Sequence, residues 1–142
     1  MNISIQRHTI TAEAARALVA AGERKAAEIG VPMVIAVCDE GGNLKAFSRM
    51  DGAALLSVEI AQNKAFTAVG FGMPTHAWYD FIKEDPPLLH GIVNHPRLVI
   101  FGGGYPIKAG DAIVGAIGVS GGHYHQDMAV AEAALAALEQ GS

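Results

Sequence analysis

Two histidines separated by one residue, His123 and His125, are the side chains of this sequence best suited to hold a metal ion. On an extended segment their imidazoles would point to the same side and could chelate, whereas on a helix only His123 and Asp127 would share a face. Protein-bound metals usually take three or four protein ligands. The spacing therefore makes the pair a candidate divalent-metal or haem-iron site, with further ligands from His76, His90 or His95; the alternative is two polar histidines at a helix start or a subunit interface.

Three small residues, Ser120, Gly121 and Gly122, come directly before these histidines. Small residues before a helix leave backbone N–H groups open to carboxylates and phosphates, so the run predicts either an anion-binding turn or a purely structural loop. The segment Gly118–Gly122 also matches the G-x-S-x-G pattern of a nucleophilic serine. Only 20 residues follow Gly122, too few to supply the other residues of a catalytic triad, so a tight turn explains the pattern better than a serine hydrolase.

Arg49 and Lys64 are the cations most suited to meet an anionic ligand. Lys64 borders a stripe of alanines, where a solvated lysine would be unusual, and a buried cation needs a partner. That partner is either an anionic ligand or one of three carboxylates, Asp39, Asp51 and Glu59. Asp127 is expected to cap or pair at the last helix, and Tyr105, next to three consecutive glycines, is a candidate for lining a pocket.

Hydrophobic periodicity predicts the elements that must position these residues. A first helix is capped by Thr11 and ends at Gly30, and the unbroken apolar run Met33–Cys38 predicts a strand buried on both faces. The remaining predicted elements are a hairpin strand at Leu44–Met50, a helix at Ala53–Val69, a short helix carrying Trp78 to Ile82, an irregular loop at Asp85–Pro96, strands at Arg97–Phe101, about Ile107 and at Ala112–Val119, and a helix at His123–Glu139.

Hairpin connections are too short for parallel crossovers. The pattern therefore predicts one α+β domain over residues 1–142, with an antiparallel five-stranded sheet flanked by helices.

Composition excludes several classes of protein. The 142 residues carry a net charge of −4, so the chain lacks the basic surface of a nucleic-acid binder. With 51% hydrophobic and only 17% charged residues, disorder is excluded, and subunit interfaces are expected to cover part of the surface. No run of about 20 apolar residues exists for a membrane helix, and the first residues lack the apolar core of a secretory signal. The single Cys38, inside an apolar run, is expected to be buried and suits the cytoplasm.

Two groups of residues resemble a known family. The first group comprises Ile35–Asp39 with Gly42 and Leu44, Arg49–Ala53, Ile60–Ala61 and Lys64–Ala65; the second comprises Gly103–Ile107, Val114–Gly122, Gln126–Asp127 and Val130–Ala131. Together they resemble the GlcG/HbpS-like family, named for a glycolate-locus protein and an extracellular haem-binding protein. The chain is also similar to the C-terminal domain of the propanediol-utilisation corrinoid adenosyltransferase.

The resemblance implies a profilin-like antiparallel sheet flanked by helices, assembled into dimers or larger homo-oligomers. It also implies haem or tetrapyrrole binding and, as in some members of the family, haem degradation or a redox link. In that hypothesis a histidine ligates the iron and Arg49 or Lys64 meets the propionates. The family more commonly has other residues where this chain has His123-Tyr124-His125, so the alternative is a metal-dependent enzyme that uses the histidine pair on a small carboxylate-bearing metabolite. A third hypothesis is an accessory protein without a ligand.

Overall fold

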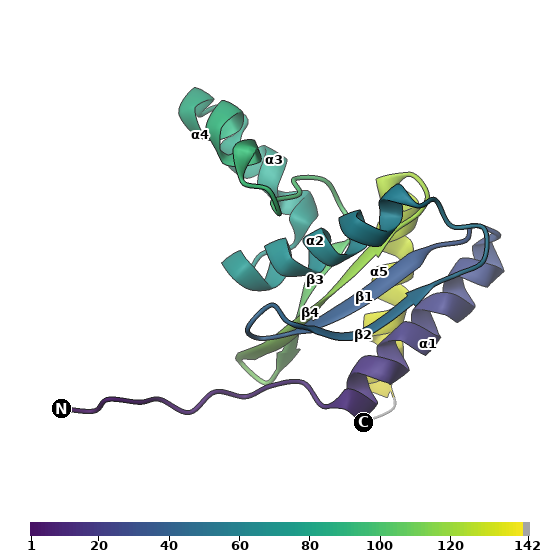
Figure 1. Ribbon diagram of the computed structural model, residues 1–142, viewed down its shortest axis with the longest axis horizontal. Coiled ribbons are helices and arrows are strands. Elements are labelled where there is room, and N and C mark those ends of the chain that lie inside the picture. The colour runs from purple at the N-terminus through teal and green to yellow at the C-terminus, as the bar shows by residue number, and fades with distance from the viewer. Residues whose placement is uncertain (141–142) are drawn as a thin grey trace.

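A computed structural model describes residues 1–140. Its elements in chain order are α1 (Ala12–Ile29), β1 (Val34–Asp39), β2 (Leu44–Arg49), α2 (Leu56–Phe71), η1 (Thr75–Ala77), α3 (Trp78–Ile82), α4 (Pro86–Gly91), η2 (Ile92–Asn94), β3 (Gly104–Ala109), β4 (Ala112–Ser120) and α5 (Tyr124–Gln140). Residues 1–9 extend away from the body as an exposed N-terminal segment (Figure 1).

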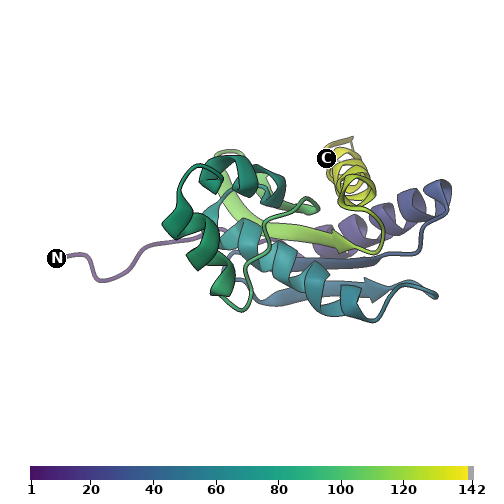
Figure 2. The same ribbon diagram turned by 90° about the horizontal axis from the view of Figure 1, so that it is seen from above.

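The sheet has the strand order β2-β1-β4-β3, and every neighbouring pair is antiparallel. Helices α1 and α5 pack side by side on one face, and α2 covers the other (Figures 1 and 2). This arrangement confirms the α+β class. None of the described helices is long and apolar enough to cross a membrane.

Strand β1 is buried on both faces, as its unbroken apolar run predicts. Because successive side chains alternate, Ile35 and Val37 join the core under α1 and α5, while Val34, Ala36 and Cys38 face α2. The facing stripe of α2 consists of Ala61, Ala65 and Ala68. These small side chains let the helix backbone lie directly on the sheet.

Strand β4 contributes to this close approach through Gly118. A Cβ atom at that position would collide with the backbone carbonyl of Ala61 and would lie 2.6 Å from the backbone nitrogen of Ala65. The glycine therefore sets how closely α2 approaches the sheet. This distance in turn fixes the positions of the α2 side chains at the end of the sheet.

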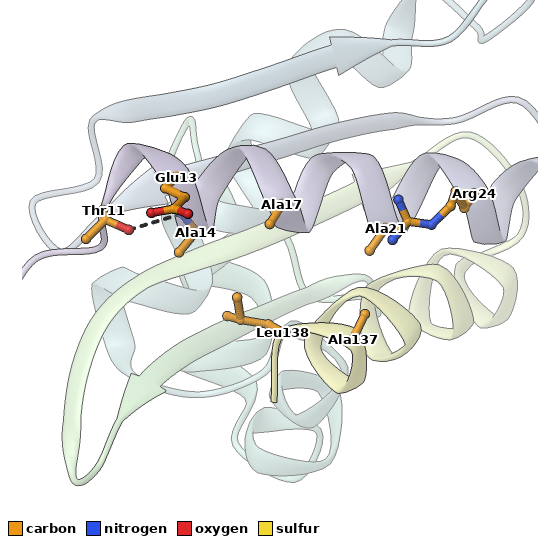
Figure 3. A pocket seen from close by; sticks show the side chains of 8 residues that line it. All are labelled: Thr11, Glu13, Ala14, Ala17, Ala21, Arg24, Ala137 and Leu138. Atoms are coloured by element: carbon orange, nitrogen blue, oxygen red, sulfur yellow. Dashed lines mark hydrogen bonds between the residues drawn. The ribbon is translucent and has the colours of Figure 1, made fainter. Parts of the chain in front are cut away.

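The predictions for α1 are confirmed at both ends. The hydroxyl of Thr11 accepts a 3.0 Å hydrogen bond from the backbone N–H of Ala14, and Gly30 ends the helix with a left-handed φ of 76°. A shallow groove of about 340 Å³ runs between α1 and α5 (Figure 3). Its floor is mostly alanine, and Glu13 and Arg24 are its ionisable residues.

The prediction of five strands is wrong, since the sheet of residues 1–140 has four. The segment Arg97–Phe101 is not a strand, because a side chain rather than a strand satisfies its backbone. The hydroxyl of Thr67 donates to the carbonyl of Arg97 at 2.9 Å and accepts from the N–H of Val99 at 3.0 Å. The expected loop at Asp85–Pro96 instead contains α4 and η2, which project with α3 from the body (Figure 1).

Candidate functional site

A buried ion pair joins α2 to α5 at the end of the sheet. The ammonium of Lys64 lies 2.7 Å from the Asp127 carboxylate and donates a second hydrogen bond, of 2.8 Å, to the carbonyl of Val119. Lys64 is 0% exposed and Asp127 only 2%. The expected carboxylate partners Asp39, Asp51 and Glu59 are therefore wrong: the partner is 63 residues away in the sequence, brought close because α2 packs on β4 and α5 begins just after β4.

Burial of this pair disfavours the charged form of both side chains. Burial lowers the pKa of Lys64 and raises the pKa of Asp127, while the charge of each residue shifts the pKa of the other back toward its ordinary value. Phe101 covers the ammonium at 5.1 Å from its ring centroid, and a Cβ at Gly103 would lie 2.7 Å from the Lys64 nitrogen. Since the ammonium is enclosed, it is not placed to meet a ligand in solvent.

The turn from Ser120 to Gly122 is occupied by groups of the chain itself. The second oxygen of Asp127 accepts from the N–H of Gly122 at 3.1 Å, and the side-chain oxygen of Gln126 accepts from the N–H of His123 at 3.0 Å. Both acceptors come from the first turn of α5, so they cap their own helix. An external anion at this turn would have to displace one of them.

The hydroxyl of Ser120 contacts the hydroxyl of Ser57 at 3.2 Å. Among residues 1–140 its hydrogen-bonding partner is thus another serine and not a general base that could activate it.

The histidine pair lies at the surface just before and at the start of α5. The rings of His123 and His125 are 4.8 Å apart, and each packs on Tyr124, at 4.1 and 4.6 Å between centroids. The backbone N–H of His125 donates to the Nδ1 atom of His123 at 3.2 Å. Within residues 1–140, no group of three or more His, Cys, Asp or Glu side chains is arranged to hold a metal ion.

Next to this pair, the surface is hollowed over a volume of about 350 Å³. We call it the His76 hollow; its lining residues are His76, Tyr79, Asp80, Ile100, Phe101, Gly102 and Tyr124. Tyr124 belongs both to the hollow and to the histidine cluster. His123 and His125 do not line the hollow themselves, but their exposed imidazoles contact Tyr124 at its rim. The volume falls within the roughly 300–1,000 Å³ typical of small-molecule sites.

The other residues singled out from the sequence do not line this hollow, although the ring of Tyr105 contacts that of His76 at 5.5 Å between centroids. Arg49 is on edge strand β2, and its guanidinium donates to the carbonyl of Ala53 at 2.9 and 3.2 Å. Tyr105, on β3, donates to the carboxylate of Glu132 at 2.7 Å. Burial and this bond raise the pKa of Tyr105, so its phenol stays protonated.

The remaining two candidate histidines are also separated from the pair. His90 is exposed on α4, and His95 stacks on Phe66, at 6.5 Å between the ring centroids. Of the three helper histidines considered, the structure therefore brings only His76 to the hollow beside His123 and His125.

Sequence reasoning missed the aromatic walls of the hollow, Tyr79 and Phe101. Both are large apolar side chains left about half exposed, at 53% and 43%. The usable signal was their neighbourhood: Phe101 precedes three consecutive glycines, Gly102 to Gly104, where backbone packs closely on Lys64 and Thr75.

The fold and the hollow define a class of protein: a four-stranded antiparallel sheet between helices, with an aromatic and histidine-bearing surface at the start of the last helix. Residues 10–136 match the family model described as haem degrading protein HbpS-like. The chain belongs to this HbpS-like family.

The chain is similar to several known proteins along most of its length. It is 44% identical over 137 residues to an uncharacterized 15.0 kDa protein of the dhaT-dhaS intergenic region of Citrobacter freundii, covering 95% of this chain and 96% of the relative. It is 35% identical over 127 residues to the corrinoid adenosyltransferase PduO of Salmonella typhimurium, covering 88% of this chain but only 38% of that enzyme.

Two solved structures agree closely with this fold. The Klebsiella pneumoniae protein ORFY superposes with a TM-score of 0.90 at 40% identity, over 98% of this chain and 97% of that one. A structure described as a PduOC:heme complex gives a TM-score of 0.85 at 34% identity, over 91% of this chain and 94% of the other. Similar proteins of this fold therefore include one solved with haem bound.

Proposed function

We propose that this protein binds haem, or a closely related tetrapyrrole, in the His76 hollow. The observation that carries the proposal is the haem complex of PduOC, which shares 34% identity and the whole fold with this chain. The description of the family as haem degrading supports the same ligand.

The residues of the hollow suit a macrocycle with an iron centre. Tyr79, Ile100, Phe101 and Tyr124 provide apolar and aromatic surface for a flat ring. His76 on one side and the rim histidines His123 and His125 offer exposed imidazoles, which are common axial ligands of haem iron.

The proposed propionate partners need revision at one position. Lys64 is enclosed and paired with Asp127, so it supports the turn that carries the histidines rather than a ligand carboxylate. Arg49 keeps part of its guanidinium free but lies on the far edge strand, two strands from β4. In a single chain the propionates would therefore project toward solvent.

We also propose that the protein acts in the cytoplasm as a homo-oligomer. Large apolar side chains are exposed at the end of α2 and on α3, among them Phe71 at 57% and Phe81 at 55%. Exposed apolar surface of this kind is typical of subunit contacts. Light scattering coupled to size-exclusion chromatography tests the assembly.

A visible-absorption titration of untagged protein with haemin tests the ligand. We expect a saturable Soret shift at a fixed stoichiometry, with a weakened or altered band in His76→Ala, His123→Ala or His125→Ala. His90→Ala is the matched control, because His90 is equally exposed but lies on α4 outside the hollow. Absence of a saturable shift refutes haem binding, and an unchanged spectrum in the triple variant refutes the site.

The alternative of a metal-dependent enzyme has less support. A divalent ion at His123 and His125 would need at least one more ligand, and residues 1–140 hold no suitable third side chain. Metal analysis of the untagged protein, with His123→Ala for comparison, tests whether the histidine pair binds a divalent metal.

A further inference from the structure

A second hollow shares no lining residue with the His76 hollow. We call it the Arg97 hollow; its lining residues are Phe66, Thr67, Gly70, Phe71, Trp78, Ile92, His95, Arg97 and Leu98. It is formed between α2 and the segment that follows α4. Its volume is about 210 Å³, below the range of drug-sized sites, so it fits only a small ligand.

The charged group of this hollow is Arg97, whose guanidinium is held but not saturated. Its Nε atom donates to the side-chain oxygen of Asn63 at 3.0 Å, and its Cζ atom lies 3.9 Å from the centroid of the Phe66 ring. These contacts fix the plane of the guanidinium. Within the described chain its two terminal Nη groups have no hydrogen-bond acceptor, and together they can bind a carboxylate end-on through two parallel hydrogen bonds.

The backbone that carries Arg97 is fixed as well. The hydroxyl of Thr67 bridges the carbonyl of Arg97 and the N–H of Val99. The N–H of Arg97 donates to the Nδ1 atom of His95 at 3.2 Å. Because these hydrogen bonds hold the backbone around Arg97, less conformational entropy is lost when its guanidinium binds a ligand.

The walls of the hollow are apolar and carry no acidic side chain. Phe71 and Trp78 contact each other at 4.9 Å between ring centroids, and Ile92 and Leu98 close the other side. The indole N–H of Trp78 is buried and also lacks an acceptor among residues 1–140. An apolar lining with one unsaturated guanidinium complements a ligand with a single negative charge and an apolar body.

We propose that the Arg97 hollow binds a small monocarboxylate with a short aliphatic or aromatic body. The carboxylate pairs with the terminal nitrogens of Arg97, and the apolar body lies against Phe71, Trp78 and Leu98. Phosphate fits less well, because the hollow offers one cation and few other donors for its additional oxygens. This site is independent of haem binding.

The fluorescence of Trp78 reports on this site directly, because the sequence contains a single tryptophan and it lines the hollow. Hexanoate is the probe and hexanamide, which has the same body without the charge, is its neutral counterpart. We expect a saturable fluorescence change with hexanoate and at least tenfold weaker binding of hexanamide.

The variant that tests the assignment is Arg97→Gln, which is expected to weaken hexanoate binding at least tenfold. Arg97→Lys keeps the charge but loses the planar fork, so it is expected to bind more weakly than the natural protein and more tightly than Arg97→Gln. Arg24→Gln, in the groove between α1 and α5, is the matched control and should bind normally. Circular dichroism establishes that each variant is folded.

Three results would overturn the proposal: no saturable change with hexanoate, equal binding of hexanamide, or unchanged affinity in folded Arg97→Gln. A fluorescence change that follows protein concentration rather than hexanoate would assign this face to contacts between copies of the chain. Haemin titration of Arg97→Gln separates the two proposals, because its Soret response should match that of the natural protein.

Discussion

Replacing Lys64 with methionine removes the ammonium from the buried ion pair while keeping a long, flexible apolar stem in its place. Asp127 stays buried at 2% exposure and retains the N–H of Gly122 as a hydrogen-bond partner. An uncompensated carboxylate in this position is strongly disfavoured, so the folded variant is expected to take up a proton on Asp127.

The cost of that proton can be worked out from the ordinary pKa of the carboxyl, 3.8. Each pH unit above this value costs about 1.4 kcal/mol, so protonating Asp127 at pH 7 costs about 4 kcal/mol. This agrees with the roughly 3–5 kcal/mol measured for broken buried ion pairs. The folded variant holds a proton that its unfolded chain releases above pH 3.8, so the destabilisation increases as the pH rises and shrinks as the pH falls.

Urea unfolding at pH 7 and pH 5, at one fixed protein concentration, measures both quantities. In the natural protein, the Lys64–Asp127 pair holds one proton in both the folded and the unfolded state near neutral pH. Its free energy of unfolding therefore does not depend on pH through this pair, and it serves as the reference. We expect Lys64→Met to lose about 4 kcal/mol at pH 7 and about 1.5 kcal/mol at pH 5. The matched control is Lys25→Met, whose exposed pair with Glu28 should contribute less than about 0.5 kcal/mol at both pH values.

A loss below about 1 kcal/mol at pH 7 would show that the pair does not hold a buried charge. An equal loss at pH 7 and pH 5 would refute proton uptake by Asp127, even if the variant is destabilised. The double replacement of Lys64 and Asp127 by apolar residues should recover much of the lost stability, since it leaves no buried charge behind.

Two further predictions concern the packing of the sheet. Gly118→Ala should destabilise the protein by more than about 3 kcal/mol or prevent folding, because the new Cβ meets the backbone of Ala61 and Ala65. The control is Gly91→Ala, which has open space around it and should cost less than about 1 kcal/mol. Thermal unfolding measures both variants. Burial raises the pKa of Cys38 to about 11, so iodoacetamide at pH 8 should label it only after denaturation, and rapid labelling of the folded protein would contradict its burial.

The sequence was most informative where neighbouring residues determine the structure. The apolar run from Met33 to Cys38 predicted a strand buried on both faces, and the structure places β1 at the centre of the sheet. Thr11 and Gly30 marked the ends of α1, because capping hydrogen bonds join residues only a few positions apart. The family motifs likewise run through contiguous segments, and the family was therefore evident before the fold was known.

Long-range contacts decided what the sequence left open. Arg97–Phe101 has the composition of a strand, yet Thr67 of α2 satisfies its backbone, and a hydroxyl 30 residues earlier carries no periodic signal. Asp127 was expected to cap or pair at the last helix, and one of its oxygens does cap α5 by accepting from the N–H of Gly122. Only the tertiary fold decided that its other oxygen pairs with Lys64.

For the functional surface, the sequence by itself determined which side chains were available: a histidine pair at the start of the last helix and a run of small residues before it. Only the tertiary structure decided that His76 and Tyr124, which contacts both histidines, line one hollow, that Lys64 is enclosed and that Arg97 keeps free donors. The physical reason is that exposure and unsatisfied hydrogen bonds depend on which distant segments pack together. Residue type and spacing predict chemistry, but packing decides which groups remain free to perform it.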